Sequence, residues 1–385
     1  MKHLILKILC AAAAAAAMIS CTGKENPDPA GSSGLEMKSS AYYIAAGGSD
    51  VAYLSVYYDG VEVTGSPDIT VYIEENGETS VYESTEWSSA EECEVSFYAE
   101  WNNETSEPIV IAAVSGIAEV PDDPQPDEWS HFVKNVLMVQ GTSVGCVYCP
   151  YVMDALDKFY GNAAYSEYAE HAVLAALHCN VNVKDPMSSS DILEVMAAFP
   201  TAFYGVPSLM FDLNDRSYIG SNATPTLIAS YISRSIENGA ATAIAASVTG
   251  RESTGTVSVT AKVKVGEAGS YRIAAWLLED GIEYFQYNGT EIEMPRIVTH
   301  NNAVRAVSCV SPAQGEYLGG KKDHDAETVV DFSCEFDIST AKVENLSNCH
   351  VVIFVTSPNM SGSSTFYLDN AVDCGINQRV GFRYE

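Results

Sequence analysis

A pair of cysteines at a predicted strand-to-helix junction constrains the fold of this chain more than any other feature. The stretch GCVYCPY, residues 145–151, sets Cys146 and Cys149 three positions apart. The apolar run NVLMV precedes it, and apolar residues follow it at helical spacing, namely Val152, Leu156 and Phe159. This periodicity predicts that the two thiols lie where a buried strand turns into a helix.

The segments behind this junction alternate between strand and helix patterns. The nearly unbroken apolar run HAVLAALHC, 171–179, predicts a strand buried on both faces of a parallel sheet. The run SSSD at 188–191 offers caps for a helix that continues through Phe199. VPSLMFD and RSYIG then predict a hairpin, and Thr224-Pro225 opens a helix that ends at Gly239.

This order of elements resembles the thioredoxin fold over residues 129–240. Val206-Pro207 falls where that superfamily carries a cis-proline facing its cysteines, so Pro207 joins the candidate site. More narrowly, the chain from Trp129 to its C-terminus resembles the Omp28-related outer-membrane lipoproteins. The segments that carry this resemblance are VLMVQGTSVGCVYCP, GVPSL, EYFQYNG, THNNAVRAV and YLDNAVDCG. The resemblance implies a fold and an outer-membrane location, and it says little about activity.

A cysteine pair in this position suits thiol–disulfide exchange. A helix N-terminus favours the thiolate, so Cys146 would attack a disulfide and Cys149 would resolve the mixed disulfide. Parallel strands end at the same edge of a sheet, so we expect His178 and Cys179 beside the CVYC turn. A cationic His178 would lower the pKa of Cys146 further.

Two positions depart from a fully competent reductase. The buried carboxylate often found six residues before the first cysteine is Gln140 here, and the tryptophan often found directly before that cysteine is Gly145. An amide cannot accept a proton, so proton transfer during exchange would have to use water or His178.

Other interpretations of the cysteines stay open. A purely structural disulfide between Cys146 and Cys149 is one, since secreted cysteines tend to oxidise. Zinc would need the two cysteines, His178 and Cys179 to converge. A c-type haem would need a histidine where Pro150 stands. The sequence therefore predicts no metal site and no cofactor.

The composition on both sides of this region is β-rich. Short strands and turn signals predict an immunoglobulin-like sandwich over 35–119, a Pro-rich linker over 120–128 and a second antiparallel sandwich over 241–385. The predicted fold class is thus an α/β thioredoxin-like domain flanked by two antiparallel β-sandwiches. The last part holds four cysteines that allow three pairings or free packed thiols, namely Cys309, Cys334, Cys349 and Cys374.

The N-terminus predicts a lipid anchor. Residues 1–20 combine basic residues with an alanine-rich apolar stretch, as in a secretory signal peptide, and Cys21 follows where a bacterial lipoprotein is lipidated. Residues 21–34 are polar and rich in Pro, Gly and Ser, which predicts a flexible tether. Lys24-Glu25 resembles signals that send some lipoproteins to the outer face of the outer membrane.

The charge balance limits the partners. The formal net charge is −31, which argues against binding to nucleic acid or to anionic lipid head groups. The membrane is then reached through the lipid on Cys21, and protein or peptide partners are not specified by the sequence.

Two functions of different classes remain. One is a surface-exposed outer-membrane lipoprotein whose thioredoxin-like domain serves binding or assembly, with thiol–disulfide exchange on extracytoplasmic proteins as an added activity. The other is a dedicated extracytoplasmic thiol–disulfide oxidoreductase. The sequence leaves open whether the chain is an enzyme, because the fold does not decide between them.

Overall fold

The structure is a computed structural model that describes residues 34–48, 51–116, 118–252, 254–309, 311, 313–358 and 366–385. The expected signal peptide, Cys21 and nearly all of the expected tether lie outside these residues. Of the described residues, 44% are in strands and 13% in helices, and several of the sheets are antiparallel, which confirms the antiparallel β part of the expected fold class. No helix in this part is long and apolar enough to span a bilayer.

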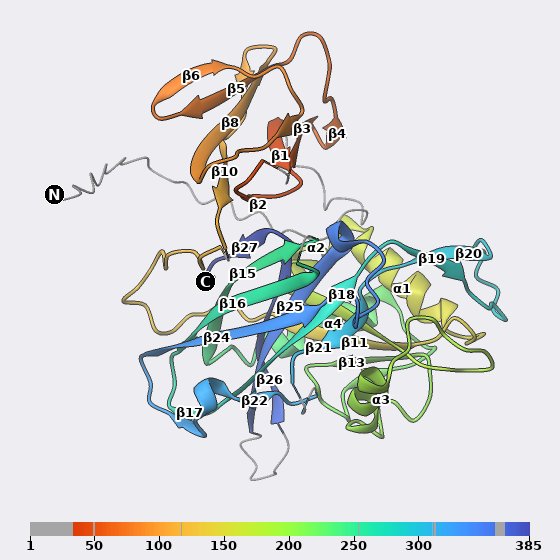
Figure 1. Ribbon diagram of the computed structural model, residues 1–385. Helices are drawn as coiled ribbons and strands as arrows, with labels where there is room; N and C mark the ends of the chain where they lie inside the picture. Colours follow the sequence, from red (N-terminus) through yellow and green to blue (C-terminus); the bar gives the residue numbers. More distant parts are fainter. Residues whose placement is uncertain are drawn as a thin grey trace.

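Residues 34–116 form a two-sheet sandwich, drawn in red to orange in Figure 1. Its core centres on Phe97, Trp87 and Ile111. The turns at Asp59-Gly60 and Asn76-Gly77 have positive φ at both positions, as two-residue hairpin turns require. One sheet contains β1 (Leu35–Ser39), β3 (Ala52–Tyr58), β4 (Val61–Glu62) and β7 (Glu86–Trp87); the other contains β2 (Tyr43–Ala45), β10 (Ile109–Val114), β8 (Cys93–Trp101), β5 (Thr70–Glu75), β6 (Glu78–Val81) and β9 (Glu104–Thr105).

Residues 136–236, in which strands and helices alternate, build one side of a nine-stranded sheet. β11 pairs in parallel with β12 and antiparallel with β13. Because side chains alternate along a strand, Val136 and Met138 of β11 pack with α1 and α4, whereas Leu137 and Val139 pack with α3. The elements are β11 (Val136–Thr142), α1 (Pro150–Tyr160), η1 (Ala163–Tyr165), α2 (Ser166–Ala169), β12 (Ala172–His178), α3 (Ser190–Ala197), β13 (Ser208–Phe211), β14 (Tyr218–Ile219) and α4 (Pro225–Ile236).

The same sheet continues into the C-terminal part. β12 pairs in parallel with β21, and the order proceeds through β18, β25 and β26, with β22 also on β18. Strands from both sides of the expected boundary after residue 240 therefore share one sheet. These strands are β18 (Arg272–Glu279), β21 (Ala303–Val307), β22 (Glu316–Tyr317), β25 (Cys349–Pro358) and β26 (Phe366–Gly375).

A four-stranded antiparallel sheet packs on β18, β25 and β26 and closes a second sandwich core. Its order is β24-β16-β15-β27, and the alternating valines of β16 face the core as expected. The strands are β15 (Thr242–Arg251), β16 (Thr256–Val265), β24 (Thr328–Asp337) and β27 (Gln378–Val380). Smaller elements are β17 (Gly269–Ser270), β19 (Ile282–Phe285), β20 (Ile297–His300), η2 (Leu318–Gly320), β23 (Asp323–His324) and η3 (Leu346–Asn348).

The segment expected as a Pro-rich spacer is packed against this second sandwich. Ala118 donates its N–H to Thr249 Oγ1. The buried Lys264 Nζ donates to Asp123 Oδ2 at 2.7 Å and to the carbonyls of Gln125 and Pro126. The segment therefore does not span open space, because a buried lysine on the outer face of β16 binds it.

Among the residues that the structure describes, no disulfide joins the four cysteines of the C-terminal part, and Cys93 and Cys179 form none either. Cys349 and Cys374 lie in the sandwich core, and Cys334 packs against it. Burial raises the pKa of Cys334 to about 12. The structure thus agrees with packed thiols and with none of the three possible disulfide pairings.

Candidate functional site

Cys146 and Cys149 form a disulfide at the junction of β11 and α1. Cys149 is the residue directly before α1, and Pro150 opens the helix, where its missing N–H costs no helical hydrogen bond. Both cysteines are buried, with 3% of Cys146 and none of Cys149 exposed, although Tyr148 between them is 55% exposed. The disulfide is therefore nearly inaccessible to solvent.

Pro207 belongs to a segment that contacts the disulfide. The Val206-Pro207 peptide bond is cis, as predicted. The Sγ atom of Cys146 lies 3.6 Å from the carbonyl oxygen of Val206. The sequence thus correctly placed this proline segment against the first cysteine.

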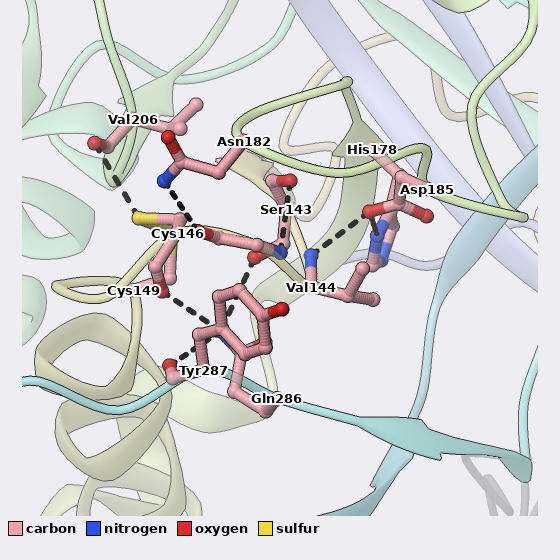
Figure 2. Close-up of a disulfide and its surroundings, with 11 residues drawn as sticks. Ser143, Val144, Cys146, Cys149, His178, Asn182, Asp185, Val206, Gln286 and Tyr287 are labelled. Atoms are coloured by element: carbon pink, nitrogen blue, oxygen red, sulfur yellow. Dashed lines mark hydrogen bonds and ion pairs between the residues drawn. A yellow bond between two sulfur atoms is a disulfide. The ribbon is translucent and has the colours of Figure 1, made fainter.

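A segment from the C-terminal part covers the CVYC loop. This covering segment comprises residues 286–289 and follows β19 (Figure 2). Tyr287 donates its N–H to the Val144 carbonyl at 2.8 Å, and Gly289 donates its N–H to the Val147 carbonyl at 2.9 Å. The loop is therefore paired with the covering segment by backbone hydrogen bonds.

The side chain of Gln286 also binds the loop, in addition to these backbone hydrogen bonds. Its Nε2 lies 2.9 Å from the Cys146 carbonyl and 3.2 Å from the Ser143 carbonyl. Gln286 is 3% exposed, and its Oε1 has no hydrogen-bond partner. Burial removes water from both polar atoms of this amide, and the hydrogen bonds from Nε2 to the two loop carbonyls offset that cost. The packing of the loop therefore depends on this residue.

Gly145 is explained by its surroundings. A Cβ atom at this position would overlap the Val181 carbonyl oxygen. Asn182 donates to the Gly145 carbonyl at 3.0 Å. The loop after β12 therefore occupies the space that the side chain before Cys146 would need, and a tryptophan has no room there.

His178 is hydrogen-bonded to Asp185, whereas the sequence predicted that it would act on Cys146. It ends β12 beside the loop, because it is in register with Thr142, but its Nδ1 lies 2.9 Å from Asp185 Oδ2. Asp185 also accepts the Val144 N–H at 2.9 Å. Figure 2 shows His178 and Asp185 at the Val144 end of the loop and the disulfide at the other end. His178 thus acts on the loop through Asp185 rather than on the Cys146 sulfur.

Asp185 is a charged anchor for the loop. It is 1% exposed, and its Oδ1 accepts the Met187 N–H. Burial opposes the charge, but hydrogen bonds from His178 and from backbone N–H groups hold the pKa of the carboxyl below its usual range. Cys179, next to His178, is a different case: burial, then Asp185, raises the pKa of its thiol to about 11, so it stays protonated at neutral pH.

A cavity of about 80 Å³ lies beside His178. Gln140 and His178 line it, together with residues of α1 and of the segment 299–302. The rings of His178 and His300 meet edge to face, with centroids 5.4 Å apart. Burial, then the neighbouring His178, lowers the pKa of His300 to about 4, so its imidazole is neutral at physiological pH.

Three of the residues around the loop were not identified as site residues from the sequence. Gln286 and His300 lie in EYFQYNG and THNNAVRAV, two of the segments that carried the family resemblance. Those segments could have indicated a shared role, but not a contact with the cysteines. Asp185 had no signal beyond its position seven residues after His178.

Comparison with known proteins supports part of this picture. Residues 202–364 match the family described as outer membrane protein Omp28, so the expected resemblance to this family is confirmed over that range. The match indicates an outer-membrane-related protein. The matched range contains Pro207 and the covering segment but begins after the CVYC loop. No curated protein matches the chain.

A solved structure, HBP35 of Porphyromonas gingivalis, shares the fold with a TM-score of 0.53 and 19% identity, over 64% of this chain and 77% of that chain. At this identity the likeness concerns the fold alone. A β-glucosidase from Kluyveromyces marxianus is 8% identical, with a TM-score of 0.17 over 87% of this chain and 45% of that chain. That similarity is too low to carry an argument.

Proposed function

We propose that this chain is a lipid-anchored, surface-exposed outer-membrane protein that serves binding or assembly, with a thioredoxin-like central domain as its scaffold. The observation that carries the proposal is the burial of the disulfide under the covering segment. An attacking thiolate must reach a disulfide sulfur in line, and 3% and 0% exposure of the two cysteines leaves no such approach. In the closed arrangement the CVYC disulfide stabilises the loop instead of exchanging.

The two flanking sandwiches support the same function. The N-terminal sandwich and the C-terminal sandwich, which shares a sheet with the central unit, both present β surfaces, and the net charge of −31 keeps such surfaces soluble. The Omp28 match supports the outer-membrane part of the proposal. Attachment through Cys21 and exposure at the cell surface rest on the signal-like N-terminus alone.

Thiol–disulfide exchange is the second candidate, and one observation favours it. The cis Val206-Pro207 bond lies against Cys146, and Cys149 directly precedes α1. This arrangement would present the disulfide to an extended peptide if the covering segment moved away. The activity would then be conditional on that movement.

The reduction potential of the Cys146–Cys149 pair separates the two functions. We expect a value below about −300 mV, as in structural disulfides that glutathione does not reduce. Cys149→Ser should then trap no mixed disulfides with envelope proteins, and Cys146→Ser, which lacks the attacking thiol, is the matched control. A potential near −200 mV, roughly that of exchange catalysts, together with adducts that only Cys149→Ser forms, would establish the oxidoreductase instead.

The anchor is tested separately. The wild-type protein should partition into detergent, and Cys21→Ala should leave it in the aqueous phase, because the lipid is attached only at that cysteine. If Cys21→Ala stays in the membrane fraction, the lipoprotein assignment is wrong whatever the disulfide does.

A further inference from the structure

We propose that the cavity beside His178 binds a neutral sugar, through the hydroxyl groups along one edge of the sugar ring. The cavity is lined by residues of β11, β12, α1 and the segment 299–302. It uses neither cysteine. The proposal therefore goes beyond the function given above and does not depend on whether the disulfide is closed.

Gln140 is a polar side chain on an otherwise apolar face of the sheet. Val136 and Met138, which precede it on the same face of β11, pack with α1 and α4. Gln140 is 7% exposed, and no hydrogen bond to another described residue involves its side-chain amide. A buried amide without a partner costs free energy. A hydrogen-bonding group inside the cavity that Gln140 lines would remove this cost.

Other polar groups of the cavity are also left without protein partners. The side chains of Thr142 and Asn302 line it and make no hydrogen bond to another described residue. Asn301 accepts the Gly281 N–H with its Oδ1, and its Nδ2 has no partner among the described residues. Carboxamides donate and accept from neighbouring atoms. Two adjacent hydroxyl groups of a sugar require this combination, because each hydroxyl both donates and accepts.

The charges around the cavity favour a neutral ligand. No lysine or arginine is among the described residues that line it. His178 is already paired with Asp185 through Nδ1. Burial lowers the pKa of His300 to about 4, which leaves its ring neutral. A phosphate or carboxylate would therefore meet no free cation, whereas Asp157 adds an acceptor for a hydroxyl group.

The size of the cavity fits part of a sugar. One water needs roughly 10–15 Å³, so a cavity of about 80 Å³ holds about five to eight groups of that size. A hexose has more non-hydrogen atoms than this, so one edge of its ring enters and the rest stays outside. Asp157 and Thr299 on the lining are exposed, which shows that the cavity reaches the surface. Met153, Leu156 and Leu174 supply apolar surface for the C–H groups of the ring.

Saturation-transfer NMR on the full chain tests the proposal. The protein is held in lauryldimethylamine oxide, because a glycoside detergent would compete with the probes. The probes are the methyl glycosides of glucose, galactose, mannose and N-acetylglucosamine, and methyl glucuronide is the anionic counterpart of methyl glucoside. At least one neutral glycoside should bind with a Kd of about 1 mM, as the usual ligand efficiency gives for a molecule of this size. Methyl glucuronide should bind at least about tenfold more weakly than methyl glucoside, because its carboxylate finds no cation.

Variants of the lining locate the bound probe. Gln140→Met removes the amide and keeps the side chain long, and it should weaken binding of the best glycoside about tenfold or more. Ala176→Leu fills the cavity, which Ala176 lines, and should abolish binding. Gln125→Met makes the same chemical change on an exposed side chain outside the cavity, so it should bind as the wild type does. Thr142→Val, which loses one hydroxyl group, should weaken binding about fivefold and serves if Gln140→Met does not fold.

Three results would each overturn the site. A wild-type protein that binds none of the neutral glycosides would mean that the cavity holds ordered water only. Wild-type affinity in folded Gln140→Met and Ala176→Leu would place the probe elsewhere on the protein. Methyl glucuronide that binds as tightly as methyl glucoside would contradict a site for neutral ligands.

Discussion

Replacing Gln286 by alanine should uncover the CVYC disulfide without unfolding the protein. The side chain joins the covering segment to the loop through two buried carbonyl groups, those of Ser143 and Cys146. The backbone pairing of Tyr287 and Gly289 with the loop remains in the variant. The substitution therefore weakens the contact between the segment and the loop, and it leaves both disulfide cysteines in place.

The expected magnitude follows from these two hydrogen bonds. A buried hydrogen bond contributes about 1 kcal/mol net, and an acceptor left buried without a partner costs about 1–3 kcal/mol. The substitution also removes Oε1 of Gln286, which is buried without a hydrogen-bond partner and destabilises the wild type. Its removal offsets part of the cost. We therefore expect local opening to become easier by about 2 kcal/mol, which multiplies the open population about 30-fold.

The rate of disulfide reduction by dithiothreitol measures this population. When the segment closes faster than the reductant reacts, the observed rate is proportional to the open fraction. Gln286→Ala should thus be reduced about 30-fold faster than the wild type at the same reductant concentration. Urea unfolding of both proteins shows how far global stability has changed.

Tyr151→Phe is the matched control for this experiment. Tyr151 donates to Glu291 Oε2 at 2.7 Å beside the covering segment, but that hydrogen bond is exposed to solvent. Its loss should change the reduction rate less than about threefold, since water replaces the partner. If Gln286→Ala were reduced at the wild-type rate while remaining folded, Gln286 would not control access, and the covering segment would not be the barrier.

Three further substitutions test other parts of the structure. Lys264→Met should lower the free energy of unfolding by about 3 kcal/mol in urea, because it leaves Asp123 near buried carbonyls without its cation; an unchanged value would mean that the segment 118–128 is not held by this lysine. Burial alone would lower the pKa of His350, but Asp373 and Asp280 raise it to about 10. This exceeds the unfolded value of about 6.5, so its stabilisation is complete below about pH 6.5 and is lost as the pH rises through about 10. Urea unfolding should show that loss in the wild type and not in His350→Phe. Gly145→Ala should cost about 1–3 kcal/mol and speed reduction of the disulfide, because its methyl group overlaps the Val181 carbonyl; a fully stable, slowly reduced variant would contradict the described loop.

Local features of the fold could be predicted from the sequence because they depend on neighbouring residues. Thr224 caps α4 through the Leu227 N–H, and Ser189 caps α3 through the Ile192 N–H, as the capping pattern indicates. The cis bond before Pro207 was also expected. The capping signals lie within a few positions of the helices that they begin, whereas the cis bond was predicted from the resemblance to the thioredoxin fold.

The contacts of the candidate site could not be predicted, because they join distant segments. Gln286 and Cys146 are 140 positions apart in the chain. Their contact depends on the parallel pairing of β12 with β21, which the sequence pattern does not specify. His178 illustrates the same limit: its place at the strand end was correct, but its partner depends on how the loop from 179 to 189 folds back.

The covering segment lies within the part of the chain that matches the family model, whereas the cysteine pair precedes that part. The Omp28 range, 202–364, contains Pro207, the covering segment and β21, but not the CVYC loop. β21 extends the central sheet, and the hairpin of β19 and β20 directly before it carries the covering segment onto the loop. A sheet extended in this way requires the added strands and the loop to pack as one unit, because the loop carbonyls would otherwise be left without donors. The covering segment thus closes over the cysteine pair, and this closure is the physical basis for proposing binding rather than exchange.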